Sequence, residues 1–170
     1  MNIVVLNGSP RANGNTAAFV KAFQEGAESV GHTVTVFPVA QMKIAACLAC
    51  EYCHGKGEGA CIQQDDMQKI YPAMAQADLV VLASPVHYWS FSGQMQAAIT
   101  RFYAPLKPTA KRYAMILSSG SDGVYNALVS QYHDMLDYFG AGDAGIRTVY
   151  GYDQKTEENL AEIRAFGASM

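Results

Sequence analysis

Short apolar runs and stretches with helical spacing alternate along the whole chain. Five runs predict β-strands: Ile3–Leu6, Thr33–Phe37, Leu79–Ala83, Ala114–Leu117 and Ile146–Tyr150. Each run is followed by hydrophobic residues at helical spacing, in the ranges 16–30, 67–74, 93–102, 128–139 and 160–166. Strands that alternate with helices predict a parallel sheet with helices on both faces.

The character of each run predicts its place in the sheet. The first, third and fourth runs are continuously apolar, which is typical of central strands buried on both faces. The second and fifth runs alternate, as edge strands do. This pattern predicts the strand order 2-1-3-4-5, which is the flavodoxin-like three-layer α/β sandwich. In that order the connections reverse direction between strands one and three, and ligands bind at this switch point.

Composition narrows the class of protein. The chain has 170 residues, half of them hydrophobic, which predicts a single domain over residues 1–170 with a cysteine-rich insertion at about 44–64. The net charge is −3 and no run of Lys or Arg occurs, which argues against a nucleic-acid partner. No stretch approaches the ~20 apolar residues of a membrane span, and the N-terminus lacks a signal-peptide pattern. We therefore expect a cytoplasmic protein without a membrane partner.

The loop after the first strand is rich in hydrogen-bond donors. It runs from Gly8 to Thr16, and a helix N-terminus, where free N–H groups favour an anion, follows it directly. Its candidate phosphate-binding residues are Ser9, Arg11, Asn13, Asn15 and Thr16. The spacing of its glycines fits neither a Walker loop nor G-x-G-x-x-G. The alternative is a plain polar turn whose helix is capped by Thr16.

Two further loops follow the third and fourth strands. The first contains four rings, His87, Tyr88, Trp89 and Phe91, which a core does not require at that position. Such rings either flank a planar aromatic ligand or pack a dimer interface, and a ligand at a dimer seam would combine both uses. The other loop offers Ser119 and Gly120 as a wall for the ligand, although ordinary turns have the same composition.

All four cysteines of the chain fall within fifteen positions, as C-x2-C-x2-C-x7-C. They are Cys47, Cys50, Cys53 and Cys61. Two-residue gaps let successive thiolates turn toward one centre, and the glycines before Cys61 let it fold back, so a [4Fe–4S] cluster fits. A closed zinc site is the alternative metal centre, although zinc usually takes two separate C-x2-C pairs. The third reading is a loop of reduced thiols without metal.

Together these motifs resemble the NAD(P)H-dependent FMN reductases. Gly8–Arg11 with Gly14–Thr16 is similar to their phosphate loop, and Ser84–Trp89 is similar to the loop beside the flavin ring. The cysteine loop followed by Asp65-Asp66-Met67 resembles the iron–sulfur flavoprotein branch of the family. The resemblance extends over essentially the whole chain. One departure is His87, which stands where a Tyr is expected.

The resemblance implies a bound FMN and NAD(P)H as co-substrate. It implies that the first loop holds the phosphate and that the ring lies against Pro85, Val86, His87, Tyr88 and Trp89, with Ser119 and Gly120 nearby. It also implies a homodimer or a dimer of dimers. The expected function is an oxidoreductase that moves electrons from NAD(P)H or ferredoxin, through FMN and with a possible role for the cluster, to a small-molecule or protein acceptor. A flavodoxin-type electron carrier and a redox-sensing module are the alternatives.

Overall fold

The fold is taken from a computed structural model, which describes residues 1–105 and 110–170. The five strands are β1 (Asn2–Asn7), β2 (Thr33–Phe37), β3 (Leu79–Pro85), β4 (Arg112–Ser119) and β5 (Gly142–Tyr150). The α-helices are α1 (Asn15–Ser29), α2 (Met67–Ala75), α3 (Gly93–Thr100), α4 (Asn126–Phe139) and α5 (Glu157–Ala168), and the 3₁₀ turns are η1 (Tyr52–His54) and η2 (Arg101–Tyr103). Among the described residues, no helix is both long and apolar enough to cross a lipid bilayer.

The strands form one parallel sheet in the order β2-β1-β3-β4-β5. This order confirms the flavodoxin-like architecture predicted from the apolar runs. The fifth strand is longer than predicted, because it begins at Gly142 rather than Ile146. The added residues lack an apolar pattern, and they pair with β4 through an irregularity between Tyr113 and Met115. At an edge strand the backbone pairing can extend beyond the hydrophobic pattern.

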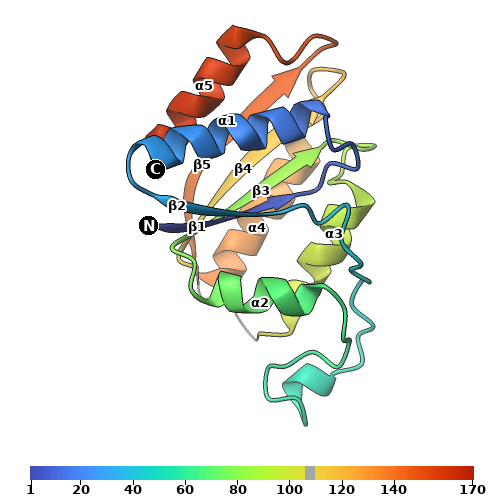
Figure 1. Ribbon diagram of the computed structural model, residues 1–170. Coiled ribbons are helices and arrows are strands. Elements are labelled where there is room, and N and C mark those ends of the chain that lie inside the picture. The colour runs from blue at the N-terminus through green and yellow to red at the C-terminus, as the bar shows by residue number, and fades with distance from the viewer. Residues whose placement is uncertain (106–109) are drawn as a thin grey trace.

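Side chains that alternate along the central strands divide the core into two layers. Val4 and Leu6 of β1 belong to a cluster formed with α2, α3 and α4, whereas Ile3 and Val5 belong to one formed with α1 and α5. Figure 1 shows α1 and α5 side by side on one face of the sheet. Each face of the sheet therefore has its own apolar core, as the continuous apolar runs predict.

Helices α1 and α5 approach closely at two glycines. A Cβ atom on Gly26 of α1 would overlap the backbone carbonyl of Arg164, and one on Gly167 of α5 would overlap that of Phe23. Both positions therefore require glycine for steric reasons. The close packing fixes α1, and with it the loop that precedes its N-terminus.

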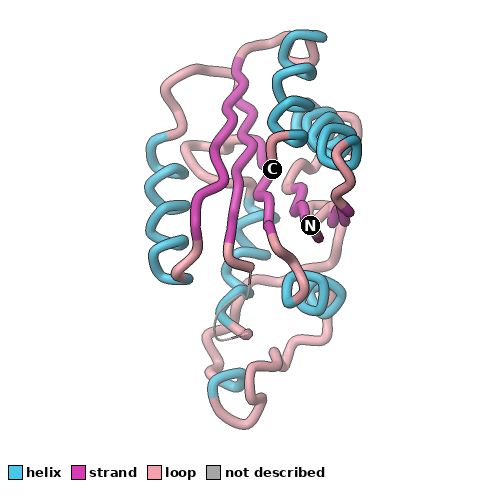
Figure 2. The backbone as a smooth tube through the Cα atoms, turned by 90° about the vertical axis from the view of Figure 1, so that its left-hand side faces the viewer, coloured by secondary structure: helices cyan, strands magenta, loops and turns pink. Residues whose placement is uncertain are grey.

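The segment 44–64, called the cysteine loop below, lies outside these layers. Apart from η1 it has no helix or strand. In Figures 1 and 2 it projects from the bottom of the molecule, beyond α2 and α3. It is therefore an excursion between β2 and α2 whose position depends on contacts with the C-terminal end of α3.

Candidate flavin and cysteine sites

The loop between β1 and α1 keeps helix N–H groups free. The N-cap of α1 is Gly14, and no side chain accepts a hydrogen bond there, so Thr16 does not cap the helix as one alternative held. The Thr16 hydroxyl instead lies 2.7 Å from the hydroxyl of Ser118 at the end of β4. The first-turn amides, which have no partner within a helix, therefore face the end of the sheet where an anion can bind.

Short hydrogen bonds hold this loop in a turn. The Ser9 hydroxyl donates to the Arg11 carbonyl oxygen at 3.0 Å, and the Ser9 amide donates to Asn7 Oδ1 at 3.0 Å. The Ser92 hydroxyl donates to the carbonyl oxygen of Gly8 at 2.7 Å, which ties the loop to the start of α3. The turn is thus set by contacts inside the protein, before any ligand binds.

The loop after β3 makes a tight two-residue turn. His87 and Ser90 pair as an antiparallel bridge, with N–H to O distances of 2.9 and 3.1 Å. Tyr88 and Trp89 at the tip both have positive φ, 53° and 60°, a conformation that costs free energy in non-glycine residues. Their side chains are 93% and 55% exposed, and their rings meet edge to face at 5.3 Å.

The loops after β4 and β5 meet through Gln154. Its Nε2 donates to the carbonyl oxygens of Ser119 and Gly151, both at 2.7 Å. Only 4% of Gln154 is exposed, yet its Oε1 has no hydrogen-bond partner in the described part of the chain. A buried acceptor without a donor is unfavourable, so this oxygen is poised to accept a hydrogen bond from a ligand.

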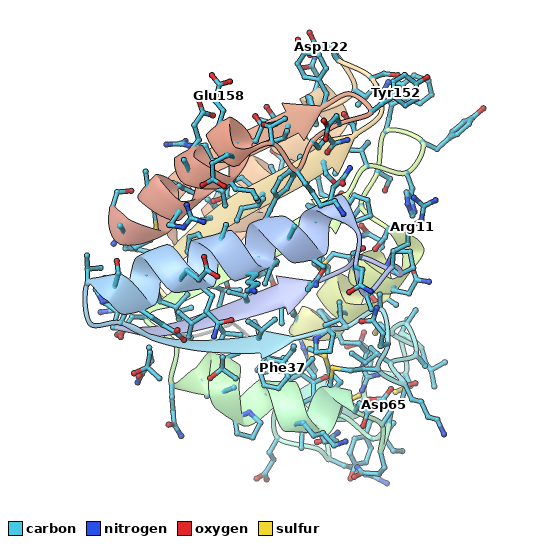
Figure 3. All side chains as sticks on the ribbon, turned by 45° about the horizontal axis from the view of Figure 1, so that its top comes forward. Arg11, Phe37, Asp65, Asp122, Tyr152 and Glu158 are labelled. Atoms are coloured by element: carbon cyan, nitrogen blue, oxygen red, sulfur yellow. The ribbon has the colours of Figure 1, made fainter. Side chains whose placement is uncertain are left out.

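These four loops enclose a cavity of about 580 Å³ at the carboxyl end of the sheet. Its lining residues are Ser9, Pro10, Arg11, Asn13, Gly14, Asn15, Thr16, Pro85, Val86, His87, Ser118, Ser119, Gly120, Gly151, Tyr152, Gln154 and Lys155. Figure 3 shows Arg11 and Tyr152 at the end of the molecule toward which the strand arrows point. The volume lies within the range of cofactor pockets, about 300–1,000 Å³.

The cavity brings together ten of the twelve residues that the sequence selected for the flavin. The exceptions are Tyr88 and Trp89, which do not line it. Sequence reasoning missed the segment 151–155, which contributes Gln154 and the cation Lys155. The signal that could have found it is the strand order, because β5 lies next to β4 and its carboxyl end reaches the same edge.

The donors and acceptors of the cavity fit FMN. Arg11, Lys155 and the first turn of α1 supply positive potential at one side, as a phosphate requires. Pro85 and Val86 supply an apolar surface, and the Val86 amide donates to the carbonyl oxygen of Ser118 at 2.7 Å, which holds the two loops together. The free Oε1 of Gln154 adds an acceptor for a hydroxyl or ring N–H.

Comparison with known proteins agrees with this geometry. Residues 1–150 match the NADPH-dependent FMN reductase family. The chain belongs to this family. The resemblance inferred from the loop motifs is therefore confirmed.

Several relatives of this FMN reductase family protein are named iron–sulfur flavoproteins. One from Methanocaldococcus jannaschii is 35% identical over 126 residues, which is 72% of this chain and 63% of that protein. One from Archaeoglobus fulgidus is 37% identical over 101 residues, 59% of this chain and 45% of that protein. The chain therefore spans about half to two thirds of the length of these relatives.

Solved structures share the fold at lower identity. An NAD(P)H:quinone oxidoreductase from Methanothermobacter marburgensis superimposes with a TM-score of 0.82 at 18% identity, covering 99% of this chain and 96% of that one. An FMN-dependent NADH-azoreductase from Bacillus anthracis, solved with FMN, gives 0.71 at 13% identity with 98% of both chains covered. At these identities the similarity establishes the fold.

A second, very small cavity of about 10 Å³ lies in the cysteine loop and is lined by all four cysteines together with Arg101 and Tyr103. The residues between successive cysteines, Ala49 and Glu51, have positive φ of 50° and 55°. These two left-handed residues lie between cysteines whose side chains line the same small cavity. Such conformations are costly in non-glycine residues and persist where surrounding contacts or a ligand fix them.

The four thiols are free of disulfides and differ in exposure. Cys53 is buried, Cys50 is exposed, and Cys47 and Cys61 are intermediate. Burial raises the pKa of the Cys53 thiol, and the three neighbouring thiols raise it further, because a thiolate there would be desolvated and repelled. A cation that binds the sulfurs would reverse this effect.

The described part of the chain contains no group of three or more His, Cys, Asp or Glu placed to hold a single metal ion. Four thiolates on one zinc ion lie about 2.3 Å from it, so the sulfurs are close together. In an iron–sulfur cluster each thiolate binds its own iron, and the sulfurs stand further apart. The structure therefore shows four cysteines around one cavity and, among its described residues, no group placed to hold one ion.

Proposed function

We propose that this protein is an FMN-dependent oxidoreductase that also carries a [4Fe–4S] cluster. Electrons from NAD(P)H or ferredoxin would pass through FMN to a small-molecule or protein acceptor. The observation that carries the proposal is the cavity at the carboxyl end of the sheet, with its anion loop, its apolar wall and the unpartnered Gln154 Oε1. FMN supplies the hydride and electron chemistry, and the protein supplies binding, orientation and electrostatics.

The residues of the first loop take the phosphate. Ser9, Asn13, Asn15 and Thr16 supply donors, and Arg11 supplies the cation. A guanidinium holds two phosphate oxygens at once, so Arg11 would fix orientation as well as charge.

The ring system would lie against the loops after β3 and β4. Pro85, Val86 and His87 form one wall of the cavity, and Ser119 and Gly120 form the other. The His87 imidazole can donate or accept a hydrogen bond at this wall. These walls exclude water from one side of the flavin and leave the mouth of the cavity to the electron donor.

Tyr88 and Trp89 support a homodimer. Two large aromatic side chains exposed at the tip of one turn are unusual for a free surface and typical of an interface. The positive φ values of both residues are also easier to explain if a second chain fixes the turn. Under this proposal the two rings act at the dimer seam, near the mouth of the flavin cavity.

The cluster would be bound by Cys47, Cys50, Cys53 and Cys61. Support comes from their common cavity and from the left-handed residues between them. The matched relatives named iron–sulfur flavoproteins add support. The cysteines are thiol ligands of the type that iron–sulfur clusters require.

The first test is composition after purification without oxygen. We expect one FMN with about four iron and four acid-labile sulfide per chain, and no zinc. FMN without iron or sulfide would refute the cluster while leaving the flavoprotein, and absence of FMN would refute the proposal. Stoichiometric zinc without sulfide would favour a structural metal site.

The second test is anaerobic stopped-flow reduction of the bound FMN. NADH, NADPH and reduced ferredoxin are compared as donors at equal concentrations. Rapid reduction by a nicotinamide followed by turnover with quinone or free flavin would support the enzyme. Reduction without turnover by any soluble acceptor would support an electron carrier instead. A Cys61→Ser variant serves as the control that retains FMN but lacks one cluster ligand.

A further inference from the structure

Arg101 is an unusual residue beside the cysteines, because its charge is almost completely buried. Its side chain is 1% exposed, and it lines the cavity that the four cysteines share. Burying a guanidinium is costly unless its charge and all its N–H groups are compensated. The next question is therefore which neighbouring groups compensate the charge and the N–H groups of Arg101.

Most of the Arg101 N–H groups bind the two ends of the cysteine loop. Nη1 donates to the Ala45 carbonyl oxygen at 2.9 Å and to Asp65 Oδ2 at 2.6 Å. Nη2 donates to the Gln63 carbonyl oxygen at 3.5 Å. Ala45 lies two residues before the first cysteine and Gln63 two residues after the last. Arg101 thus holds together the points where the loop leaves and re-enters the domain.

Thr100 and Tyr103, which lie close to Arg101 in the sequence, anchor the cysteine loop as well. The Cys47 amide donates to Thr100 Oγ1 at 3.1 Å, and the Tyr103 hydroxyl donates to both carboxylate oxygens of Glu51 at 3.0 and 3.1 Å. The rings of His54 and Tyr103 stack with centroids 3.9 Å apart. The C-terminal end of α3 and η2 therefore form a platform beneath the cysteines, and Arg101 is its buried centre.

One nitrogen of the guanidinium, Nε, differs from Nη1 and Nη2 in its hydrogen bonding. Its Nε–H is buried and has no acceptor among the residues that the structure describes. The guanidinium also lies near enough to the Cys61 thiol for their charges to interact, and the Tyr71 hydroxyl approaches the same thiol. Within residues 1–105 and 110–170, Asp65 is the one carboxylate in an ion pair with Arg101. A further anionic acceptor on the cysteine side would therefore complete the surroundings of the guanidinium.

We propose that Arg101 is a positioning residue for the cluster bound by the cysteines. Its Nε–H would donate to a sulfur of that centre, while its other N–H groups fix the ends of the loop. The inference rests on the proposed function, since it requires the cluster. Four thiolates outweigh the charge of the iron–sulfur core, so the centre is anionic, and it becomes more so when it gains an electron.

The charge and the hydrogen bond both favour the reduced centre. A cation beside an anion stabilises it more when the negative charge is larger, and hydrogen bonds to the sulfurs act in the same direction. Arg101 therefore raises the reduction potential of the cluster. Arg101 would make the cluster a better acceptor of electrons. It does not line the flavin cavity, so it would not contact the flavin.

The test is a mediated dithionite titration of anaerobically purified protein, followed by EPR. One electron enters the cluster and no covalent bond forms or breaks. Arg101→Gln removes the charge, and we expect its equilibrium constant for reduction to fall by on the order of tenfold, about 59 mV for a one-electron couple. Arg101→Lys keeps the charge but loses the planar fork, so it should lie between wild type and Arg101→Gln.

Arg164→Gln is the matched control. Arg164 is on α5, across the sheet from the cysteines, and its ion pairs with Glu25 and Glu157 are exposed. It should leave the cluster potential unchanged. Iron, sulfide and FMN are measured in every sample, because positioning and potential are separate readouts. Loss of iron from Arg101→Gln, with FMN retained and iron kept in Arg101→Lys, would support the positioning role directly.

Three results would overturn the inference in different ways. Full cluster content and an unchanged potential in both Arg101 variants would refute it and leave the proposed function intact. A wild-type protein with FMN but neither iron nor sulfide would refute the cluster and the inference together. Loss of both FMN and iron from both variants would show that Arg101 supports the whole fold and not the cluster in particular, which also overturns the inference.

Discussion

Gln154 offers the sharpest test of the flavin cavity, because its two amide atoms have separate roles. Nε2 joins the loops after β4 and β5, whereas Oε1 has no partner among the described residues. Gln154→Met keeps a side chain of similar volume and removes both polar atoms. If Oε1 accepts a hydrogen bond from FMN, the variant should bind FMN more weakly with little change in stability.

The effect of Gln154→Met on stability and its effect on FMN affinity have different magnitudes. Loss of the two Nε2 hydrogen bonds costs about 0.5–1.5 kcal/mol each, but removal of a buried, unsatisfied acceptor returns about 1–3 kcal/mol. The Ser119 carbonyl also keeps the Gly151 amide as a donor at 3.0 Å. The free energy of unfolding of the flavin-free protein should therefore change by less than about 2 kcal/mol. Loss of one hydrogen bond to FMN should raise its Kd by about 2- to 13-fold.

The assay is fluorescence titration of the flavin-free protein with FMN, paired with urea unfolding of the same sample. Gln131→Met is the control, because Gln131 is a half-buried glutamine on α4 that bonds to Gln96 and does not line the cavity. Its Kd should equal that of wild type. An unchanged Kd in Gln154→Met, with unfolding still cooperative, would show that Oε1 does not contact the flavin and would refute the argument.

Three further predictions follow from the site and the core. Arg11→Gln should raise the Kd of FMN by about tenfold and leave that of riboflavin unchanged, since only FMN carries the phosphate; equal losses for both ligands would contradict this role. Gly26→Ala should lower the free energy of unfolding by about 3 kcal/mol in urea, because its Cβ would overlap the Arg164 carbonyl. Burial alone would raise the pKa of Asp65, but hydrogen bonds led by that from Arg101 lower it overall, below 3.8. The stability from this pair should be present above about pH 4 and fall as the pH drops further; Asp65→Asn should be less stable at pH 7 and show a weaker loss from pH 5 to 3 in urea unfolding.

Much of the fold is visible in the sequence because its signals are local. Continuous apolar runs mark strands that are buried on both faces, and they placed β1, β3 and β4 at the centre of the sheet. The loop between β1 and α1 was recognised in the same way, since a strand, a polar turn and a helix follow one another directly. The cysteines were grouped by their spacing, which is also a local property.

Local patterns were insufficient where residues distant in the sequence meet. The segment 151–155 joins the cavity only because β5 lies beside β4, and its composition gave no sign of a ligand. The sequence analysis did not select Arg101, which is buried against a loop that begins more than fifty positions earlier. In both cases, long-range packing places the side chain.

The remaining differences between the sequence prediction and the structure lie at residues with unusual backbone conformation. The sequence selected Tyr88 and Trp89 for the flavin because they share a loop with Pro85, Val86 and His87. In the structure both have positive φ at the tip of the turn, and neither lines the cavity. The sequence by itself determined the order of strands, the polar loop between β1 and α1, and the set of four thiols. Only the tertiary structure decided which side chains face the cavities, because that depends on φ at single turns and on contacts between segments far apart in the chain.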